Sequence, residues 1–500
     1  MAKKRNQVGG TIDVYLELDV ARYSDTFKVV KAIEKLGGSV LHAFPPAVIV
    51  ASVDSGLENA LKKIPGVKMV STETVAGSST KKSLAAENSQ VIYARNAWND
   101  HNSVSRRLTS MDSGDLGKNW NTTGKLPPHP PAKIAAFLKA QEAKLAPPAS
   151  KDVAGSPVLS IPVLVGRIAV GVVFVDSTVA AYKITDAEKG KVVNEITEGL
   201  NMLSAFEPRA GIGWYYDFKR PKISLTAANF PAAGSNGWED TWRNAALGAM
   251  GYAASINGMN QYIADIKARN SAQHAYAIFV TKHPVTWFAY EWGNHVVMDF
   301  GVDGWGIDNF SRVVAHETGH VFGCPDEYGS CTTATLSGRY QIPNGNCQAN
   351  PASIDCLMKG NSPTVCDFTR GHLGWNELAV RSKGSTTLKG TWTFDFDSGV
   401  QGPASGADIW WEQVNTTVRF LVPKSGAMLF NLGVRNFDAV SFQTLQGLSY
   451  TSLSINGTVG SANRLTAGTV IAIRTNSGRF AKMLVKTYGY NLLIDWVTYN

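Results

Sequence analysis

The sequence feature that most constrains the fold is the run HETGHVFGCPDEY, which begins at His316 and ends at Tyr328. Residues four apart share one face of an α-helix, so a helix over the start of this run directs His316 and His320 towards one point. Two imidazoles at this spacing can bind one Zn²⁺, with Glu317 beside them to hold a water molecule. The run therefore predicts a helix over 309–322 that carries part of a metal site.

The third metal ligand is expected just after this helix. Gly323 can take the left-handed conformation that ends a helix, and Pro325 then prevents a return to it. Asp326 follows Gly323 by three residues, where a turned chain faces the metal again, and its neighbour Glu327 competes for the same role. The spacing from Gly323 selects Asp326, so the predicted metal ligands are His316, His320 and Asp326. The alternative is a helix face held by salt bridges, with no metal.

A second segment, CLMKG at 356–360, lies downstream of the first run. Together the two segments resemble the metzincin clan of zinc peptidases, whose pattern is HExxHxxGxx(H/D) followed by a turn that contains Met. The Asp at the third ligand position is similar to that of snapalysins, and the DEY ending is similar to that of bacterial IgA peptidases. The resemblance implies a zinc-dependent endopeptidase in which the predicted ligands hold one catalytic Zn²⁺, Glu317 is the general base and Met358 packs beneath the site.

The resemblance leaves one role unfilled. Residues 359–363 lack the Tyr that some metzincins place after the Met as an extra ligand. Tyr328 and His372 are candidate helpers in the transition state, although a structural role is commoner for each. The implied substrate is a protein or a peptide.

The predicted catalytic domain, residues 156–382, is expected to combine helices with a sheet. A near-continuous apolar run at 167–176 predicts a strand that is covered on both faces. Thr185 and Glu188 form a capping box at the start of a predicted helix. A strand at 295–300 is expected at the edge of the sheet, where an extended peptide can bind by strand addition.

The segment before this domain divides into two parts. Residues 11–75 follow the order βαββαβ, which predicts a ferredoxin-like domain. Its segment GVKMV, at 66–70, resembles the inhibitory propeptides of subtilisin-type proteases, which implies an inhibitor or folding chaperone. A plain interaction module is the alternative. Residues 76–155 are rich in Ser, Ala, Asn and Pro and predict a linker or activation segment with a short helix at 134–145. Such a segment would suit a zymogen.

One acidic residue in the predicted linker bears on a zymogen. Asp115 is similar to the aspartate with which astacin zymogens block zinc, although a solvated turn is the commoner role for such a residue. No Cys precedes Cys324, which excludes a cysteine switch.

Residues 383–500 consist of short alternating segments and turns, which predict an all-β sandwich or barrel. The whole chain is thus expected to be a multidomain α+β protein. Trp410 and Trp411 invite a carbohydrate- or surface-binding interpretation, but a place in a core or at a sheet edge is the favoured one. Three carboxylates, Asp395, Asp397 and Asp408, are candidate ligands for Ca²⁺. The alternative function is therefore a non-catalytic surface- or carbohydrate-binding protein that acts through this domain.

Composition sets wider bounds. The length of 500 residues suggests about three domains. The net charge of +8 is spread along the chain, which argues against a nucleic-acid partner. No apolar run approaches the ~18 residues of a membrane span. The basic N-terminus has no apolar stretch behind it, so we expect no secretory signal peptide.

Cysteine usage indicates a compartment. All five cysteines lie between Cys324 and Cys366. The easiest pairs by loop length are Cys331 with Cys347 and Cys356 with Cys366, although connectivity cannot be deduced from sequence. Disulfides imply an oxidising environment. We therefore expect action outside the cell, with cytoplasmic storage before release as an alternative.

Overall fold

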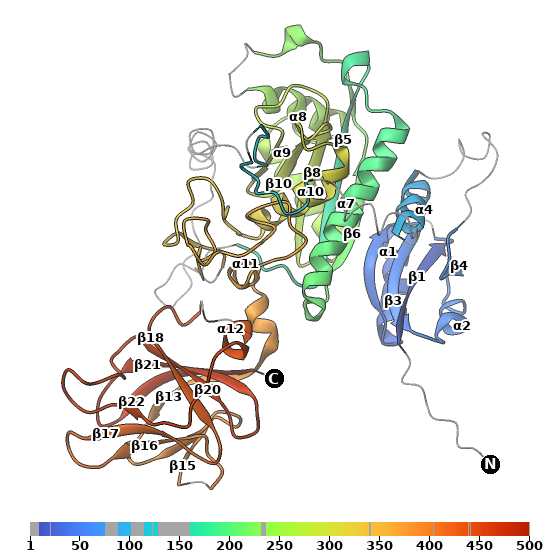
Figure 1. The fold of residues 1–500 in the computed structure, drawn as a ribbon. Coiled ribbons are helices and arrows are strands. Elements are labelled where there is room, and N and C mark those ends of the chain that lie inside the picture. Colours follow the sequence, from blue (N-terminus) through green and yellow to red (C-terminus); the bar gives the residue numbers. More distant parts are fainter. Residues whose placement is uncertain are drawn as a thin grey trace, which may run out of the picture. The chain divides into compact units, whose positions relative to one another are not determined.

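The computed structural model describes residues 10–20, 22–75, 89–101, 115–122, 124–128, 161–231, 237–339, 342–403, 405–438, 440 and 442–499. The chain divides into two compact units: unit 1 comprises Met1–Thr332 and Asn346–Val365, and unit 2 comprises Thr333–Gly345 and Cys366–Asn500. The protein is a multidomain α+β protein, as predicted (Figure 1). Among the described helices, none is long and apolar enough to cross a membrane.

Unit 1 is built on one mixed sheet with the strand order β4-β1-β3-β2-β6-β5-β8-β10-β9, and β7 pairs with β5. The strands β1 to β4 pair antiparallel with one another, the central pairs from β2·β6 to β8·β10 are parallel, and β9 is antiparallel to β10. The strands are β1 (Thr11–Leu18), β2 (Ser39–Phe44), β3 (Val48–Asp54), β4 (Val67–Ser71), β5 (Arg167–Ser177), β6 (Gly213–Lys219), β7 (Lys222–Ile223), β8 (His274–Thr281), β9 (Ala289–Trp292) and β10 (His295–Asp299). The predicted doubly covered strand is confirmed, because β5 is buried beyond its first residue.

The strands of residues 11–75 are continuous with the rest of this sheet. The helices α1 (Tyr23–Lys35) and α2 (Glu58–Leu61) lie between β1 and β4 in the predicted order. Strand β2 pairs in parallel with β6, with His42 opposite Trp214. Gly213 allows this approach, because a Cβ there would lie 2.7 Å from the carbonyl oxygen of Val40. One sheet therefore includes the N-terminal strands.

Helices cover the sheet of unit 1. They are α4 (Ser89–His101), α7 (Asp186–Phe206), α8 (Trp238–Ala249), α9 (Ile256–Arg269) and α10 (Phe310–Val321), with 3₁₀ turns η1 (Ala180–Tyr182), η2 (Pro208–Ala210), η3 (Ala227–Asn229) and η4 (Ile307–Asn309). The predicted capping box is confirmed, since Thr185 and Glu188 bond each other's backbone N–H groups. Helix α4 lies within the range predicted as a linker, whereas the helix predicted at 134–145 lies outside the described residues.

The prediction of an edge strand at 295–300 is wrong. Strand β10 has β8 on one side and β9 on the other. Among the described strands of this sheet, β9 is the edge on that side. The sequence analysis missed this because Ala289–Trp292 is a strand of only four residues, too short to stand out by its pattern.

Unit 2 contains two five-stranded antiparallel sheets and a small two-stranded one. The first sheet has the order β13-β22-β21-β20-β18 and the second β15-β14-β16-β17-β19. The strands are β11 (Leu336–Ser337), β12 (Ile342–Pro343), β13 (Val380–Leu388), β14 (Thr393–Asp395), β15 (Val400–Gly402), β16 (Ile409–Gln413), β17 (Arg419–Pro423), β18 (Met428–Val434), β19 (Ile455–Asn456), β20 (Thr469–Arg474), β21 (Phe480–Thr487) and β22 (Leu492–Tyr499); the helices are α11 (Asp367–His372), η5 (Trp375–Ala379) and α12 (Phe442–Gln446). Apolar residues from both five-stranded sheets form one core.

Candidate metal centre

Helix α10 carries the two histidines and ends where the sequence predicts. Gly323 has a φ of 84°. Its N–H donates to the carbonyl of His320 over 2.8 Å, and the N–H of Cys324 donates to the carbonyl of Gly319 over 3.0 Å. These two bonds are the Schellman arrangement that closes a helix in a left-handed residue. The chain therefore reverses at Gly323, and the residues after it return towards the helix face.

Three side chains meet at this reversal, and we call them the histidine cluster: His316, His320 and Asp326. The Nε2 atoms of the two imidazoles are 3.1 Å apart. Oδ1 of Asp326 lies 3.3 Å from each of them. His316 is fully buried and the Asp326 side chain is one-quarter exposed. The structure thus brings together the residues that the sequence singles out as ligands.

The second nitrogen of each imidazole is held by a backbone carbonyl. Nδ1 of His316 lies 3.0 Å from the oxygen of Leu357, and Nδ1 of His320 lies 2.7 Å from the oxygen of Cys324. A carbonyl can only accept, so Nδ1 carries the hydrogen in both rings. A neutral imidazole then has a lone pair at Nε2. Two lone pairs and a carboxylate oxygen therefore face one another, an arrangement that repels unless a positive charge lies between them.

The spacing suits a zinc ion. Ligands at about 2.0–2.2 Å from a tetrahedral Zn²⁺ lie roughly 3.3–3.6 Å from one another, close to the separations in the histidine cluster. The field of the site also favours positive charge: burial acts to lower the pKa of His320, but the charge and hydrogen bond of Asp326 outweigh it and raise that pKa to about 10. Glu317, the predicted general base, is fully buried on the same helix. The donor set and spacing therefore fit Zn²⁺.

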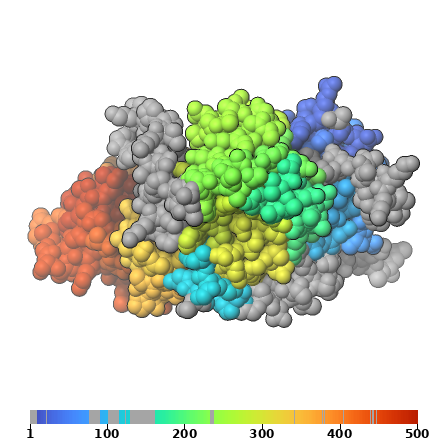
Figure 2. Space-filling model, turned by 90° about the horizontal axis from the view of Figure 1, so that it is seen from above, coloured from blue at the N-terminus to red at the C-terminus, as the bar shows by residue number. Residues whose placement is uncertain are grey.

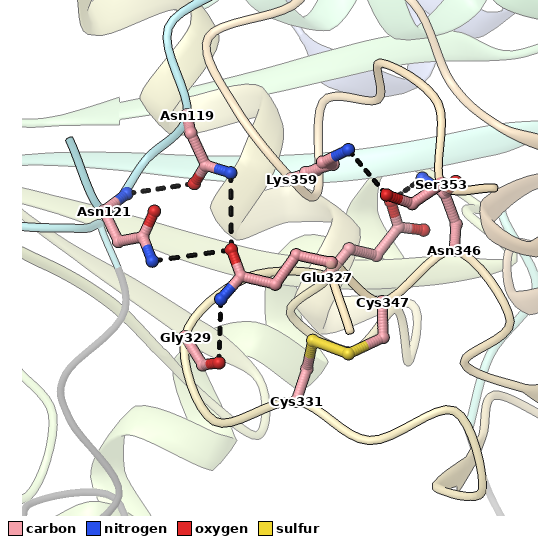
Figure 3. Close-up of a disulfide and its surroundings, with 10 residues drawn as sticks. Asn119, Asn121, Glu327, Gly329, Cys331, Asn346, Cys347, Ser353 and Lys359 are labelled. Carbon is pink, nitrogen blue, oxygen red and sulfur yellow. Dashed lines mark hydrogen bonds between the residues drawn. A yellow bond between two sulfur atoms is a disulfide. The ribbon is translucent and has the colours of Figure 1, made fainter. Parts of the chain in front are cut away.

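The structure separates Asp326 from its competitor Glu327. The Glu327 carboxylate is fully buried and accepts a hydrogen bond from the side-chain amide of Asn346 over 2.6 Å (Figure 3). Its backbone N–H donates to the carbonyl of Met358 over 3.0 Å. Glu327 thus ties the chain after α10 to the segment around Met358, while Asp326 faces the histidines.

Met358 lies against α10 at its one glycine. A Cβ at Gly319 would be only 2.8 Å from the sulfur of Met358, which is buried. A side chain at residue 319 would displace the thioether of Met358. Gly319 thus permits the contact as it stands, a role that the sequence pattern did not reveal.

The seating of α10 depends on close contacts with α7 and β8. A Cβ at Gly199 of α7 would lie 2.1 Å from the carbonyl oxygen of Ser311, so the two helices touch by their backbones. The hydroxyl groups of Tyr276 on β8 and Thr318 on α10 are 3.0 Å apart. These contacts fix the rotation of α10 about its axis and its position along that axis.

Sequence reasoning missed one group next to the site. Trp120 is fully buried and its Nε1–H donates to the carbonyl of Leu357 over 2.7 Å. This is the carbonyl that also holds His316. Trp120 lies within the range predicted as a linker, and nothing in its local sequence indicates a contact with residue 357.

The other candidate helpers have structural partners. His372 is buried in unit 2 beside the carbonyl of Ile342, 3.0 Å from its Nε2, and burial lowers the pKa of His372 to about 4. Tyr328 is buried, with its ring 6.0 Å from that of His316. Asp115 forms ion pairs with Lys118 and Lys125, which lower its pKa. It is not part of the histidine cluster.

In unit 2 the structure brings together Asp395, Asp397 and Asp408, which we call the aspartate cluster. Each carboxylate oxygen of this cluster accepts a hydrogen bond or has an ion pair within the protein; Oδ1 of Asp397 has only the ion pair, 3.2 Å from the guanidinium of Arg479. The donors are the backbone N–H groups of Phe396, Asp397 and Asn476, the hydroxyl groups of Ser398 and Ser477, and the guanidinium group of Arg479.

The tryptophan pair of unit 2 is divided. Trp411 is fully buried in the core, where its Nε1–H donates to the carbonyl of Tyr490 over 2.8 Å. Trp410 is half-buried and donates to the carbonyl of Thr391 over 3.0 Å. The favoured interpretation, a place in the core, is therefore confirmed for Trp411, and that of an exposed pair that stacks on sugars is wrong for it.

One of the two favoured cysteine pairs forms. Cys331 and Cys347 are joined by a disulfide (Figure 3). Cys324, Cys356 and Cys366 are buried, and none of the three is in a disulfide among the described residues. The expected Cys356–Cys366 bond is therefore wrong; the sulfur of Cys366 instead accepts the N–H of Thr369 at the start of α11 over 3.4 Å.

No protein-family model, curated protein or solved structure matches the chain. The geometry and chemistry of the histidine cluster are therefore the basis for assigning a function.

Proposed function

We propose that the protein is a zinc-dependent endopeptidase whose catalytic ion is held by the histidine cluster. The observation that carries the proposal is the convergence of two imidazole lone pairs and one carboxylate oxygen within 3.1–3.3 Å. Three protein ligands are typical of catalytic zinc sites, because they leave one position for water or substrate, whereas structural sites are closed by four. The resemblance to metzincins supports the same assignment.

The chain's residues divide the chemistry among themselves. A bound Zn²⁺ lowers the pKa of water towards ~7 and polarises a carbonyl group. Glu317 accepts the proton of the attacking water and then delivers it to the nitrogen of the leaving amine, so that the peptide bond breaks and a carboxylate and an amine are formed. Burial of Glu317 keeps competing water away from this transfer. The carbonyls of Leu357 and Cys324 hold the hydrogen of each neutral imidazole at Nδ1, so that the lone pair is at the ligating Nε2.

The substrate class is inferred from the sheet. Strand β9 packs beside α10, and among the described strands it pairs only with β10. An edge strand can bind an extended peptide through main-chain hydrogen bonds. We therefore infer that a peptide substrate lies along β9 with its scissile bond at the histidine cluster. Because this mode of binding uses the main chain of the substrate, it suits a protein or a peptide.

The finer fold assignments are also inferences. The order β1-α1-β2-β3-α2-β4 supports a ferredoxin-like arrangement for residues 11–75. The ligand-bearing helix, its glycine turn and the packing of Met358 support a metzincin-type catalytic domain.

Residues 11–75 are inferred to stay with the catalytic sheet. Besides the pairing of β2 with β6, Nδ1 of His42 lies 3.0 Å from the hydroxyl of Tyr216, and Phe44 stacks on Tyr216 with ring centroids 4.9 Å apart. Release of these residues would expose a sheet edge and a buried aromatic cluster. N-terminal sequencing and activity assays during prolonged incubation test this. A new N-terminus within 76–155 with higher activity would instead support a zymogen.

The disulfide supports a proposal about the compartment in which the protein acts. A Cys331–Cys347 bond next to the site favours an oxidising environment. We infer that the protein acts outside the cell.

The direct test of the mechanism is Glu317→Gln. This variant keeps the ligands, so it should retain zinc but lose roughly 10²–10⁴-fold in peptide hydrolysis, the usual contribution of a general base. The matched control is Glu412→Gln in unit 2, which should change neither property. Zinc is measured by elemental analysis after dialysis, and turnover with an unstructured protein such as casein. Undiminished turnover by Glu317→Gln would contradict the assignment of Glu317 as the general base.

A further inference from the structure

A segment from far outside the catalytic helix supports the histidine cluster. We call it the strap: residues 115–122 and 124–128. The strap pairs with the segment after Met358, since the N–H of Gly117 donates to the carbonyl of Asn361 and the N–H of Asn361 donates to the carbonyl of Lys118, both over 2.8 Å. A Cβ at Gly360 would lie 2.6 Å from the Lys118 oxygen. The two backbones are therefore in direct contact.

The far end of the strap is also fixed. The Nε1–H groups of Trp305 and Trp287 donate to the carbonyls of Leu126 and Pro127, each over 2.7 Å. The ammonium of Lys125 lies 4.4 Å from the centre of the Trp305 ring. In Figure 2 the strap, in cyan, lies on the surface of unit 1 against residues coloured yellow. It is thus held at both ends.

Between these ends the strap inserts Trp120. The side chain is fully buried, with its ring edge-on to Trp305 at 4.8 Å and to His316 at 5.5 Å. Its Nε1–H donates to the oxygen of Leu357, which also accepts from Nδ1 of His316. One carbonyl therefore receives one bond from the strap and one from a predicted metal ligand.

We propose that Trp120 is a positioning residue for His316 and that the strap is a permanent part of the metal site. This inference rests on the proposed function. Trp120 fixes the Leu357 carbonyl, and that carbonyl fixes the tautomer and the orientation of His316. Loss of such an outer partner typically costs 10–100-fold in metal affinity. Any processing of the chain that removed the strap would therefore weaken the site instead of opening it.

The test compares Trp120→Phe with Trp305→Phe in the full-length protein. Both variants shrink a buried ring and remove an indole hydrogen bond between the strap and the rest of unit 1, but only the Trp120 donor bonds the Leu357 carbonyl. Zinc affinity is measured by competition with a chelator, and the visible spectrum is recorded with Co²⁺ in the site. We expect Trp120→Phe to bind zinc about 10–100-fold more weakly and to alter the Co²⁺ spectrum, while Trp305→Phe changes affinity less than about threefold.

The outcomes separate this inference from the proposed function. Wild-type protein that binds no zinc contradicts the proposed function. Wild-type protein that binds zinc, together with unchanged affinity and spectrum in Trp120→Phe, or with an equal loss in Trp305→Phe, overturns only the role of Trp120. Circular dichroism of the metal-free variants checks folding. If Trp120→Phe does not fold, Trp120→Tyr takes its place, because it fills more volume and also lacks the indole donor.

Discussion

The histidine cluster of unit 1 and the aspartate cluster of unit 2 differ in where their hydrogen-bond partners act. In the histidine cluster the carbonyl partners bind the far side of each imidazole, so the lone pairs face inward. In the aspartate cluster the protein donors bind the carboxylate oxygens themselves. In the first arrangement the lone pairs and the carboxylate face a point that a cation can occupy. In the second, the protein already supplies positive partners to the carboxylates, including Arg479.

The comparison teaches that proximity of ligand types is a poor criterion for a metal site. Both clusters bring three ligand atoms close together. Besides the kind of ligand, the direction of the surrounding hydrogen bonds distinguishes them. We therefore expect tight metal binding at the histidine cluster and at most weak Ca²⁺ binding at the aspartate cluster.

The largest expected effect is the removal of a ligand. His316→Ala should lower zinc affinity by more than about 100-fold, because loss of a ligand exceeds the 10–100-fold cost of losing an outer partner. Asp397→Ala, the matched change in the other cluster, should leave zinc content unchanged. Elemental analysis after dialysis measures both. Equal loss of zinc from the two variants would contradict the claim that zinc binds at the histidine cluster alone.

The next effect separates the two acidic neighbours. Asp326→Asn removes the charge that faces the histidines and should weaken zinc binding by roughly 10–100-fold. Glu327→Gln should keep zinc but lower the free energy of unfolding by about 1–3 kcal/mol, because its buried carboxylate bonds Asn346. Chelator competition and urea unfolding measure these quantities. The reverse pattern would make Glu327 the ligand.

A smaller effect is expected from pH at the aspartate cluster. Burial raises the pKa of Asp408 to about 6, although two backbone N–H bonds oppose the rise. The folded state then binds a proton at Asp408 more tightly than the unfolded state does. The contribution of this proton to the free energy of unfolding is complete below pH ~4 and is lost as pH rises through 6. The loss is at most about 3 kcal/mol. It should appear in urea unfolding of the wild type and be absent in Asp408→Asn.

Calcium sharpens the same experiment. A cation bound by the carboxylates would favour their charged forms and remove this pH dependence. Because we expect at most weak Ca²⁺ binding at the aspartate cluster, millimolar Ca²⁺ should leave the pH dependence of the free energy of unfolding unchanged. Its disappearance would show that the aspartate cluster is a cation site despite its protein donors.

The smallest effect concerns the support of α10. Gly319→Ala gains helix propensity worth about 1 kcal/mol but forces a Cβ against Met358, which typically costs 1–3 kcal/mol. We expect a net loss of about 1 kcal/mol. Gly248→Ala in α8 meets no atom within 4 Å and should be neutral or stabilising. Thermal unfolding compares the two; a stabilised Gly319→Ala would mean that Met358 moves aside freely.

The sequence predicted those parts that depend on local periodicity and turn chemistry. The spacing of His316 and His320 on a helix and the left-handed turn at Gly323 required only short-range rules. The capping box at Thr185 and the buried strand β5 are of the same kind. The spacing argument that preferred Asp326 to Glu327 also agrees with where the structure places the two side chains.

The remainder depended on contacts between distant segments. The pairing of β2 with β6, the edge position of β9 and the insertion of Trp120 join residues that local patterns cannot relate. The Cys356–Cys366 bond failed for a related reason. Loop length favoured the pair, but the packing of α11 gave the sulfur of Cys366 another partner.

The central claim is tested most directly by titrating metal-free wild-type protein with Zn²⁺ in a calorimeter, alongside His316→Ala and Asp397→Ala. The account predicts one tight site per chain in the wild type and in Asp397→Ala, and no tight site in His316→Ala. Absence of tight binding by the wild type, or an unchanged tight site in His316→Ala, would contradict it.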